Sequence, residues 1–339
     1  MPSMAQNIGL RIPLASISQK GTLSPMLFSD AIKGFTLYIK SGVYSPAYVP
    51  TITGYINYMC KWLEDPDLDT ITLQDWQRYF VHLRTDYKPK RINGDTSPLA
   101  EASIDNHWKI IRSFYNWAVD TQILSSQRPD LKLARPKYQS PQVQPFTPDE
   151  IKKLIASSTQ TDVVKSNGRR YKIKRPNGDR DLSIIMMLLD TGLRVGELAR
   201  LAIGDVNLDN GEVYVRPFRS GQKTKSRTVY LGAKSRQAVW KYIAKRQAQE
   251  KSDQPLFELR GSSIRLLLRA IGKNAGITNV HPHRFRHTFA IMYLRNRGDV
   301  FTLKRLLGHS TMDMVTRYLN IVQSDLQDAH KYASPVDNL

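Results

Sequence analysis

The segment His283-Arg284-Phe285-Arg286-His287 is the most informative stretch of this sequence of 339 residues. A proline precedes it, which suits the first position of a helix, and apolar residues recur after it with helical spacing. On such a helix His283, Arg286 and His287 stand at i, i+3 and i+4 and share one face. Two imidazoles and a guanidinium on one face predict a site that grips an anion.

Two further elements follow this segment. Leu307-Gly308-His309 contains a glycine that is typical of a helix end, and Tyr318 lies nine residues after His309. Polar residues between them favour the capping of a short helix that carries Tyr318. A free phenol has a pKa near 10, so only about one in a thousand is ionised at pH 7. A tyrosine nucleophile therefore needs a base or a cationic pocket, which nearby histidines and arginines could supply.

The charge of the chain indicates an acidic polymer as its partner. Lys and Arg number 50 against 30 Asp and Glu, which gives a formal charge of +20. Nucleic acid is the favoured partner, with an anionic membrane surface as the alternative. The longest purely apolar run, Ile184 to Leu189, is far shorter than the roughly 20 residues that a bilayer span requires.

Other features of the composition exclude several classes of protein. Residues 1–18 lack the apolar core of a secretion signal, so we expect a cytoplasmic protein associated with DNA in the nucleoid. Cys60 is the one cysteine in the sequence, so neither a disulfide nor a cysteine zinc site can form within one chain. Its apolar neighbours favour a buried packing role.

The region from 23 to 137 predicts a bundle of amphipathic helices. Thr72 with Asp75 resembles a capping box ahead of one apolar stripe. A longer helix is expected over 104–118, with Lys109 and Arg112 on the side opposite its apolar residues. These two cations are candidate DNA contacts, and ordinary solvated charge is the alternative.

The region after residue 146 predicts a second domain of helices with one small sheet. Thr147-Pro148-Asp149-Glu150 offers a helix cap, and a buried helix over 182–189 is expected to break at Thr191-Gly192. Strand-like runs at 212–216 and 227–231 predict a hairpin. The fold class is therefore mainly α, with a small antiparallel β hairpin or sheet.

Two segments of this region concentrate positive charge. Residues 162–180 contain seven basic residues around two Asn-Gly turn signals, which predicts a protruding hairpin or loop. Residues 217–226 form the cationic tip of the hairpin predicted above. The candidate DNA contacts in the two segments are Arg169, Arg170, Lys172, Lys174, Arg219 and Lys225.

Five elements in this order resemble the tyrosine recombinases, the lambda-integrase-like site-specific recombinases. The resemblance covers Thr147 to Leu319, and the helices before it resemble the family's core-binding domain more loosely by size and position. The matching elements are Thr191-Gly192-Leu193-Arg194-Val195-Gly196-Glu197-Leu198, the hairpin tip with Lys223, His283-Arg284-Phe285-Arg286-His287, Leu307-Gly308-His309 and Tyr318.

The resemblance implies that Tyr318 attacks a DNA phosphate, which gives a 3′-phosphotyrosyl link and a free 5′-hydroxyl. Arg194 and Arg286 would hold the non-bridging oxygens, because a guanidinium donates two parallel hydrogen bonds and keeps its charge. By the same resemblance His283 would act as acid or base toward the tyrosine, and His309 would donate a hydrogen bond to the phosphate.

The resemblance also assigns the supporting residues. Lys223 would protonate the leaving 5′ oxygen. It is followed by Thr224-Lys225 here, where the family usually has a glycine, so Lys225 remains a competitor. Glu197 matches an acidic residue that supports the site, and we expect His287 to be a packing or supporting group.

We expect no cofactor. The family keeps the energy of the broken bond in the protein–DNA ester, so rejoining needs neither ATP nor a metal. The sequence has no P-loop glycine-lysine motif and no HExxH motif. A metal site made of His281, His283 and His287 is disfavoured, because Arg286 between them would repel a cation.

The resemblance further implies a two-domain, C-shaped DNA clamp that works as a homotetramer on two double-stranded DNA sites, through a Holliday junction. We expect a site-specific recombinase, specifically the integrase or transposase of a mobile element. The roughly 22 residues before the first helix leave no room for an arm-binding domain, which favours a simple recombinase that acts at core sites. The expected organisation is an N-terminal tail (1–22), a helical, SAM-like core-binding domain (23–137), a linker (138–146), a catalytic domain (147–322) and a C-terminal tail (323–339) that packs on a neighbouring protomer.

Three alternatives stay open at this stage. A type IB topoisomerase shares the tyrosine, arginine and lysine chemistry but relaxes supercoiled DNA as a monomer. A recombinase that resolves chromosome dimers would use the same residues. A DNA-binding accessory protein would leave them unused.

Overall fold

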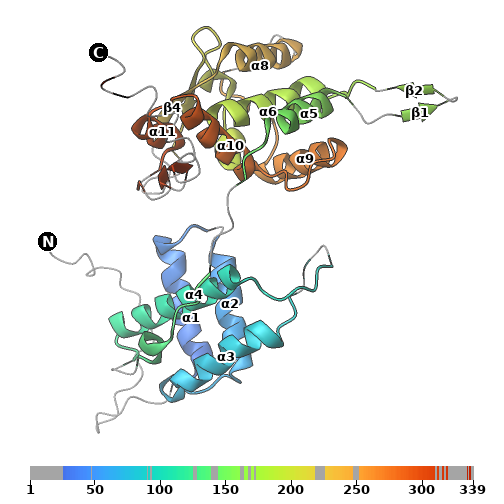
Figure 1. The fold of residues 1–339 in the computed structure, drawn as a ribbon. Coiled ribbons are helices and arrows are strands. Elements are labelled where there is room, and N and C mark those ends of the chain that lie inside the picture. The colour runs from blue at the N-terminus through green and yellow to red at the C-terminus, as the bar shows by residue number, and fades with distance from the viewer. Residues whose placement is uncertain are drawn as a thin grey trace. The chain divides into compact units, whose positions relative to one another are not determined.

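The computed structural model divides into two compact units, Met1–Pro141 and Gln142–Leu339 (Figure 1). Both units are mainly helical, and the strands pair in two small antiparallel sheets, which confirms the predicted fold class. No helix in the described ranges is long and apolar enough to cross a membrane. The structure describes residues 26–46, 48–89, 91, 94–124, 128–138, 144–160, 164–166, 169–171, 173–217, 226–246, 252–309, 311–312, 315–316, 318–319, 334 and 336.

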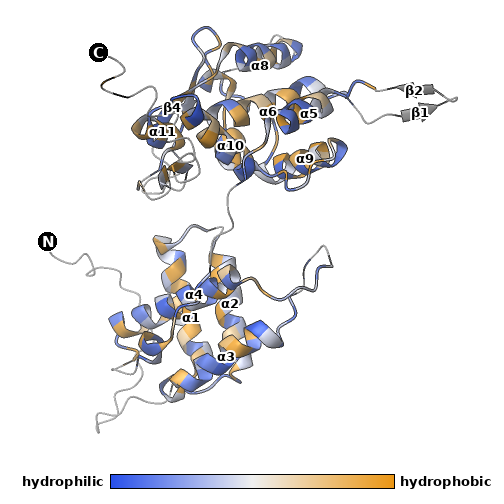
Figure 2. Cartoon of the chain, in the orientation of Figure 1, coloured by the Kyte–Doolittle hydropathy of each residue, from blue (hydrophilic) through white to orange (hydrophobic). Residues whose placement is uncertain are grey.

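The first unit is a bundle of amphipathic helices with an aromatic core. Hydrophobic and hydrophilic residues alternate around the same helices (Figure 2), and the buried stripes meet at Phe28, Phe35, Trp76, Phe114 and Tyr115. The helices are α1 (Phe28–Tyr38), α2 (Val49–Trp62), α3 (Leu73–Thr85) and α4 (Glu101–Asp120), with shorter turns η1 (Ile39–Val43), η2 (Leu68–Thr70) and η3 (Pro129–Lys132).

Thr72 and Asp75 start α3 as the sequence predicts. The Thr72 side chain accepts a hydrogen bond from the Asp75 backbone N–H, and the Asp75 carboxylate accepts one from the Thr72 backbone N–H. This reciprocal pair satisfies two N–H groups that the first turn of a helix leaves without partners.

Two buried carboxylates fasten the segment after α4 to that helix. Asp105 is fully buried and pairs with Lys109 and Arg135, each at 2.7 Å. Asp130 is also fully buried and pairs with Arg112 at 3.2 Å and with Arg128 at 2.7 Å. Both candidate DNA contacts of α4 therefore already contact carboxylates within the unit, and DNA binding by Lys109 and Arg112 stays a prediction.

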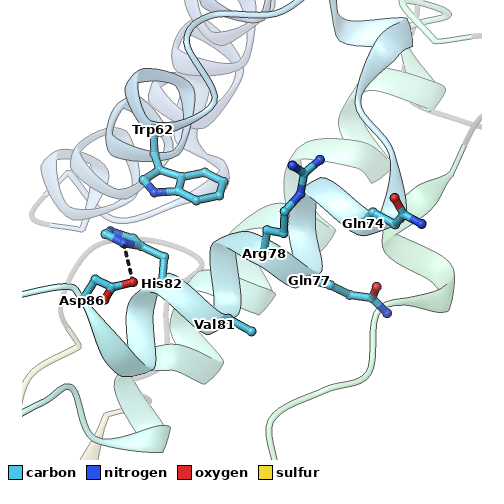
Figure 3. Close-up of a pocket in the computed structure, with 7 residues that line it drawn as sticks. All are labelled: Trp62, Gln74, Gln77, Arg78, Val81, His82 and Asp86. Atoms are coloured by element: carbon cyan, nitrogen blue, oxygen red, sulfur yellow. Dashed lines mark ion pairs between the residues drawn. The ribbon is translucent and has the colours of Figure 1, made fainter.

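A surface pocket lies where the end of α2 meets α3 (Figure 3). The Trp62 ring stacks on the His82 ring, with 5.4 Å between their centroids, and the His82 Nδ1 lies 3.8 Å from the Asp86 carboxylate. Gln74, Gln77, Arg78 and Val81 complete the lining. None of the candidate catalytic residues lines this pocket.

The second unit surrounds α6 with the other helices. Thr147 and Glu150 form the predicted capping box of α5. α6 packs against α5, α8 and α10, and α11 packs against α10 and β4 (Figure 1). The elements are α5 (Pro148–Thr159), β1 (Val164–Ser166), β2 (Arg169–Tyr171), α6 (Gly178–Thr191), α7 (Val195–Leu198), η4 (Ile203–Asp205), β3 (Glu212–Val215), β4 (Arg227–Tyr230), α8 (Ala233–Lys245), α9 (Gly261–Asn274), α10 (Pro282–Arg295) and α11 (Val300–Leu307).

Each sheet of this unit is an antiparallel pair of strands. β1 and β2 form the hairpin predicted in the basic segment, with Lys165 opposite Arg170, and it extends away from α5 and α6 (Figure 1). In the other sheet Val213 faces Val229 and Val215 faces Arg227. The predicted hairpin of β3 and β4 is therefore confirmed.

We expect Asp130→Asn to lower the free energy of unfolding by about 1–3 kcal/mol, because Arg112 and Arg128 lose their buried negative charge and one of its two acceptor oxygens. Urea unfolding followed by tryptophan fluorescence measures the change. Asp120→Asn is the control, since Asp120 is exposed at the end of α4 and its substitution should change stability by no more than about 0.5 kcal/mol. Equal effects of the two substitutions would show that the buried pair does not hold the segment.

Candidate active site

The end of α6 brings the first arginine of the site toward α10. Gly192 has a φ of +60°, and a Cβ there would lie 2.4 Å from the Phe289 ring, so only glycine fits. The chain then turns, and Arg194 becomes the N-cap of α7. The predicted break at Thr191-Gly192 is confirmed, and it places Arg194 at the start of a helix beside the polar face of α10.

Arg286 is the central buried cation of the site. Its exposed fraction is 4%, and it donates to the Gly192 carbonyl at 2.7 Å and to the Leu307 carbonyl at 2.6 Å. Burial, together with the charge of Arg194, lowers the pKa of the guanidinium to about 9, so it stays protonated at neutral pH. One side chain thus joins the ends of α6 and α11 to α10.

His309 follows α11 and contacts the same guanidinium. Its Nε2 lies 2.8 Å from an Arg286 nitrogen. Burial and the charges of Arg286 and Arg194 lower the pKa of His309 to about 4, so the ring is neutral near pH 7. Because a guanidinium only donates, Nε2 accepts and the ring hydrogen is on Nδ1. That Nδ1 is buried and has no partner among the described residues, so it is a free donor.

Glu197 holds two arginines at once. Its carboxylate accepts from the Arg194 side chain at 3.0 Å and backbone N–H at 2.8 Å, and from Arg227 at 3.0 and 2.8 Å. Burial alone would raise the pKa of Glu197, but the hydrogen bonds and charges of Arg227 and Arg194 outweigh it and hold the pKa at about 2. Glu197 is therefore ionised and fixes both guanidinium groups.

Arg227 is a site residue that our sequence reasoning missed. It starts β4 opposite the buried Val215. Its two terminal nitrogens bind Glu197, and its Nε donates to the Leu306 carbonyl at 2.7 Å. The signal that could have found it is the two-residue period of the strand: Arg227 shares parity with Val229 and Leu231, which are both buried. A cation on the buried face of a strand should have an acidic partner.

Tyr318 lies against α10 with its phenol inside the unit. Its exposed fraction is 2%, and it packs with Phe289, Leu303 and Leu307. The phenol oxygen lies 2.8 Å from Nδ1 of His287. The structure therefore brings His287 to the tyrosine, whereas His283, one turn earlier, is exposed and its ring centroid lies 6.4 Å from that of His287. The role of His283 toward the tyrosine stays a prediction.

The remaining candidate residues are placed as follows. Lys223, Lys225, Arg219 and Lys172 lie outside the described residues. Arg169 and Arg170 are placed in β2 by their backbone, and Lys174 is exposed. Among the described residues no group of three or more histidine, cysteine or acidic side chains is arranged to hold a metal. His281 instead caps α10, with its Nδ1 3.3 Å from the Arg284 backbone nitrogen.

We expect Glu197→Gln to lower the free energy of unfolding at pH 7 by roughly 2–3 kcal/mol, because the folded pKa lies well below that of a free glutamate. A lowered pKa stabilises the fold above the unfolded-state value, near pH 4.3, and this contribution is lost as the pH falls toward 2. The difference between wild type and variant should therefore shrink over that window in urea unfolding curves.

Glu258→Gln provides the matched control, because the Glu258 side chain is 67% exposed in its pair with Arg246. An exposed pair of this kind contributes at most about 1 kcal/mol. A Glu197→Gln defect that stays constant from pH 7 to pH 3 would contradict the ionised, doubly paired state.

Known proteins are similar to this chain in sequence. The family model described as the phage integrase family matches residues 144–324. Tyrosine recombinase XerA of Saccharolobus solfataricus is 27% identical over 286 residues, which covers 84% of each chain. Tyrosine recombinase XerC of Staphylococcus saprophyticus is 26% identical over 280 residues, covering 80% of this chain and 85% of that protein.

Solved structures share the fold. The Tn1549 transposon integrase in complex with a circular intermediate DNA superposes with a TM-score of 0.65 at 15% identity, covering 90% of this chain and 99% of that one. A lambda integrase dimer bound to a COC′ core site gives a TM-score of 0.64 at 16% identity, with 86% and 95% covered. Since the family model spans more than half of the sequence, the chain belongs to the phage integrase family, and it is a tyrosine recombinase that breaks and rejoins DNA strands.

Proposed function

We propose that the chain is a site-specific recombinase that cuts and rejoins double-stranded DNA through Tyr318, with a 3′-phosphotyrosyl intermediate and a Holliday junction. The observation that carries this proposal is the cluster of Arg194, Arg286 and His309 in the same unit as a tyrosine that contacts α10. The side chain of Arg194 is 35% exposed, so it is accessible to a phosphate.

The proposed roles follow from the charges of these groups. Arg194 and Arg286 hold the non-bridging oxygens, and charge-assisted bonds of this kind contribute roughly 1.5–3 kcal/mol each. His309 donates a hydrogen bond to the phosphate. Lys223 protonates the leaving 5′ oxygen, with Lys225 as the competing assignment. A positioned acid of this kind contributes about 10²–10⁴ in rate.

DNA is held, in this proposal, by cations outside the cluster as well. The basic hairpin of β1 and β2 and the exposed Lys174 are proposed contacts, together with Lys109 and Arg112 of α4. We propose that 23–137 is the core-binding domain, 147–322 the catalytic domain and 138–146 the linker, in a cytoplasmic protein that acts on DNA.

We further propose that the recombinase serves a mobile element, which the match to the phage integrase family model supports. A recombinase that resolves chromosome dimers is the second candidate, because the relatives aligned over most of both chains are named recombinases rather than integrases. The genes that flank this one distinguish the two candidates, since an integrase gene lies within the element that it moves.

We expect the wild type to form a covalent protein–DNA adduct on a nicked suicide substrate, and Tyr318→Phe to form none, because phenylalanine lacks the attacking oxygen. Denaturing gels measure the adduct, and a gel shift checks that the variant still binds DNA. An adduct that persists in Tyr318→Phe would exclude this nucleophile. Relaxation of a supercoiled plasmid without a cognate site would favour the type IB topoisomerase instead.

The C-terminal tail (323–339) is proposed to pack on a neighbouring protomer of a tetramer. Deletion from Leu319 onward should therefore abolish recombination between two sites and leave binding to a single site nearly unchanged. Gel shifts with one site and recombination assays with two sites measure the two properties. Loss of single-site binding in the truncated chain would contradict a role in assembly.

A further inference from the structure

The cleavage proposed above releases a proton from the nucleophile, and a histidine lies within hydrogen-bond distance of that nucleophile. His287 Nδ1 lies 2.8 Å from the Tyr318 oxygen, and the two ring centroids are 5.6 Å apart. The 2.8 Å between Nδ1 and the phenol oxygen is typical of a direct hydrogen bond. His283, which the family resemblance favours for this role, is exposed on the preceding turn of α10.

The protonation state of His287 fits an acceptor. Burial, reinforced by the neighbouring His283, lowers the pKa of His287 to about 4, so the imidazole is neutral at pH 7. The charged or titratable groups that face it are His281, His283 and Arg286 of its own helix, and Tyr318 from the C-terminal segment. With the phenol as donor, Nδ1 supplies the lone pair and Nε2 carries the hydrogen.

We propose that His287 is a catalytic residue that accepts the phenolic proton of Tyr318 during DNA cleavage. This inference rests on the proposed function, in which Tyr318 is the nucleophile. As the phenol oxygen forms its bond to phosphorus, the bond from phosphorus to the 5′ oxygen breaks. The phenolic proton passes to Nδ1 of His287, and the 5′ oxygen receives a proton from the lysine acid.

DNA itself strengthens this acceptor. The charge of Arg286 disfavours a protonated His287 while no anion is bound, and a phosphate held by Arg286 would offset that charge. Protonated His287 then becomes easier to form at the moment of attack. During rejoining the 5′-hydroxyl attacks phosphorus and gives its proton back to the lysine, while the bond from phosphorus to the phenol oxygen breaks. The imidazolium returns its proton to the phenol, so one residue serves both directions.

The test compares His287→Phe with His283→Phe and wild type on the suicide substrate. The rate of adduct formation is measured from pH 6 to pH 9.5 under single-turnover conditions. We expect His287→Phe to be slower by about 10²–10³-fold at pH 7. This defect should shrink at least tenfold toward pH 9.5, because a phenol that ionises by itself, with a pKa near 10, needs no acceptor.

A phenylalanine keeps the packing of the ring but not the lone pair, so a structural role alone would not make the defect depend on pH. His287→Asn is the second variant, since its amide oxygen can accept a hydrogen bond but cannot take the proton. It should show the same recovery with pH, and thermal unfolding with gel shifts confirms that each variant folds and binds DNA.

Two results would overturn the proposal: a wild-type rate in both His287 variants, or recovery with pH in His283→Phe and not in the His287 variants. Failure of the proposed function would give another result: Tyr318→Phe would still form the adduct, because Tyr318 would then not be the nucleophile. If Tyr318→Phe forms no adduct and the His287 variants react normally, only the assignment of the proton acceptor is wrong.

Discussion

The buried guanidinium of Arg286 is the interaction on which the second unit depends. Both carbonyls that it binds stand at helix ends: Gly192 closes α6 and Leu307 is the last residue of α11, and each end has a glycine with φ near +60°. The C-terminus of a helix carries a partial negative charge. Carbonyl dipoles can therefore stabilise the cation without cancelling its charge, as a carboxylate would.

The charges around Arg286 leave the site electropositive. Arg194 and Arg227 pair with the carboxylate of Glu197, which also acts on Arg286 through its charge, so these four side chains carry three positive charges against one negative charge. The same field explains why the pKa of His309 is lowered, since a further proton would add to an existing excess. A site built in this way keeps His287 and His309 neutral and carries an excess of positive charge.

Local sequence signals predicted the parts of this site that depend on local geometry. The glycines before Arg194 and His309, the capping boxes of α3 and α5, and the polar face of α10 all follow from spacings of a few residues. Contacts between distant segments could not be predicted. Helical spacing places His283 and His287 on one face, but the path of the chain after Gly308 decides that His287 reaches Tyr318.

The same limit applies to the charged residues. Asp130 lies 18 residues after Arg112, and only the return of the segment after α4 brings them together. Arg227 was missed for a related reason, because its partner Glu197 lies 30 residues earlier on another element. The number of cations in a segment therefore says little about how many of them are available to DNA.

α10 is fixed on opposite sides by neighbouring arginines. Arg284 pairs with Glu150 at 2.9 Å, and its guanidinium lies 4.0 Å from the centroid of the Phe146 ring, so it holds the first residues of the unit. Arg286 is two residues, or about 200°, farther around the helix and binds the ends of α6 and α11. A helix anchored on both sides cannot easily rotate. Tyr318, in contrast, joins α10 through apolar packing and a side-chain hydrogen bond to His287.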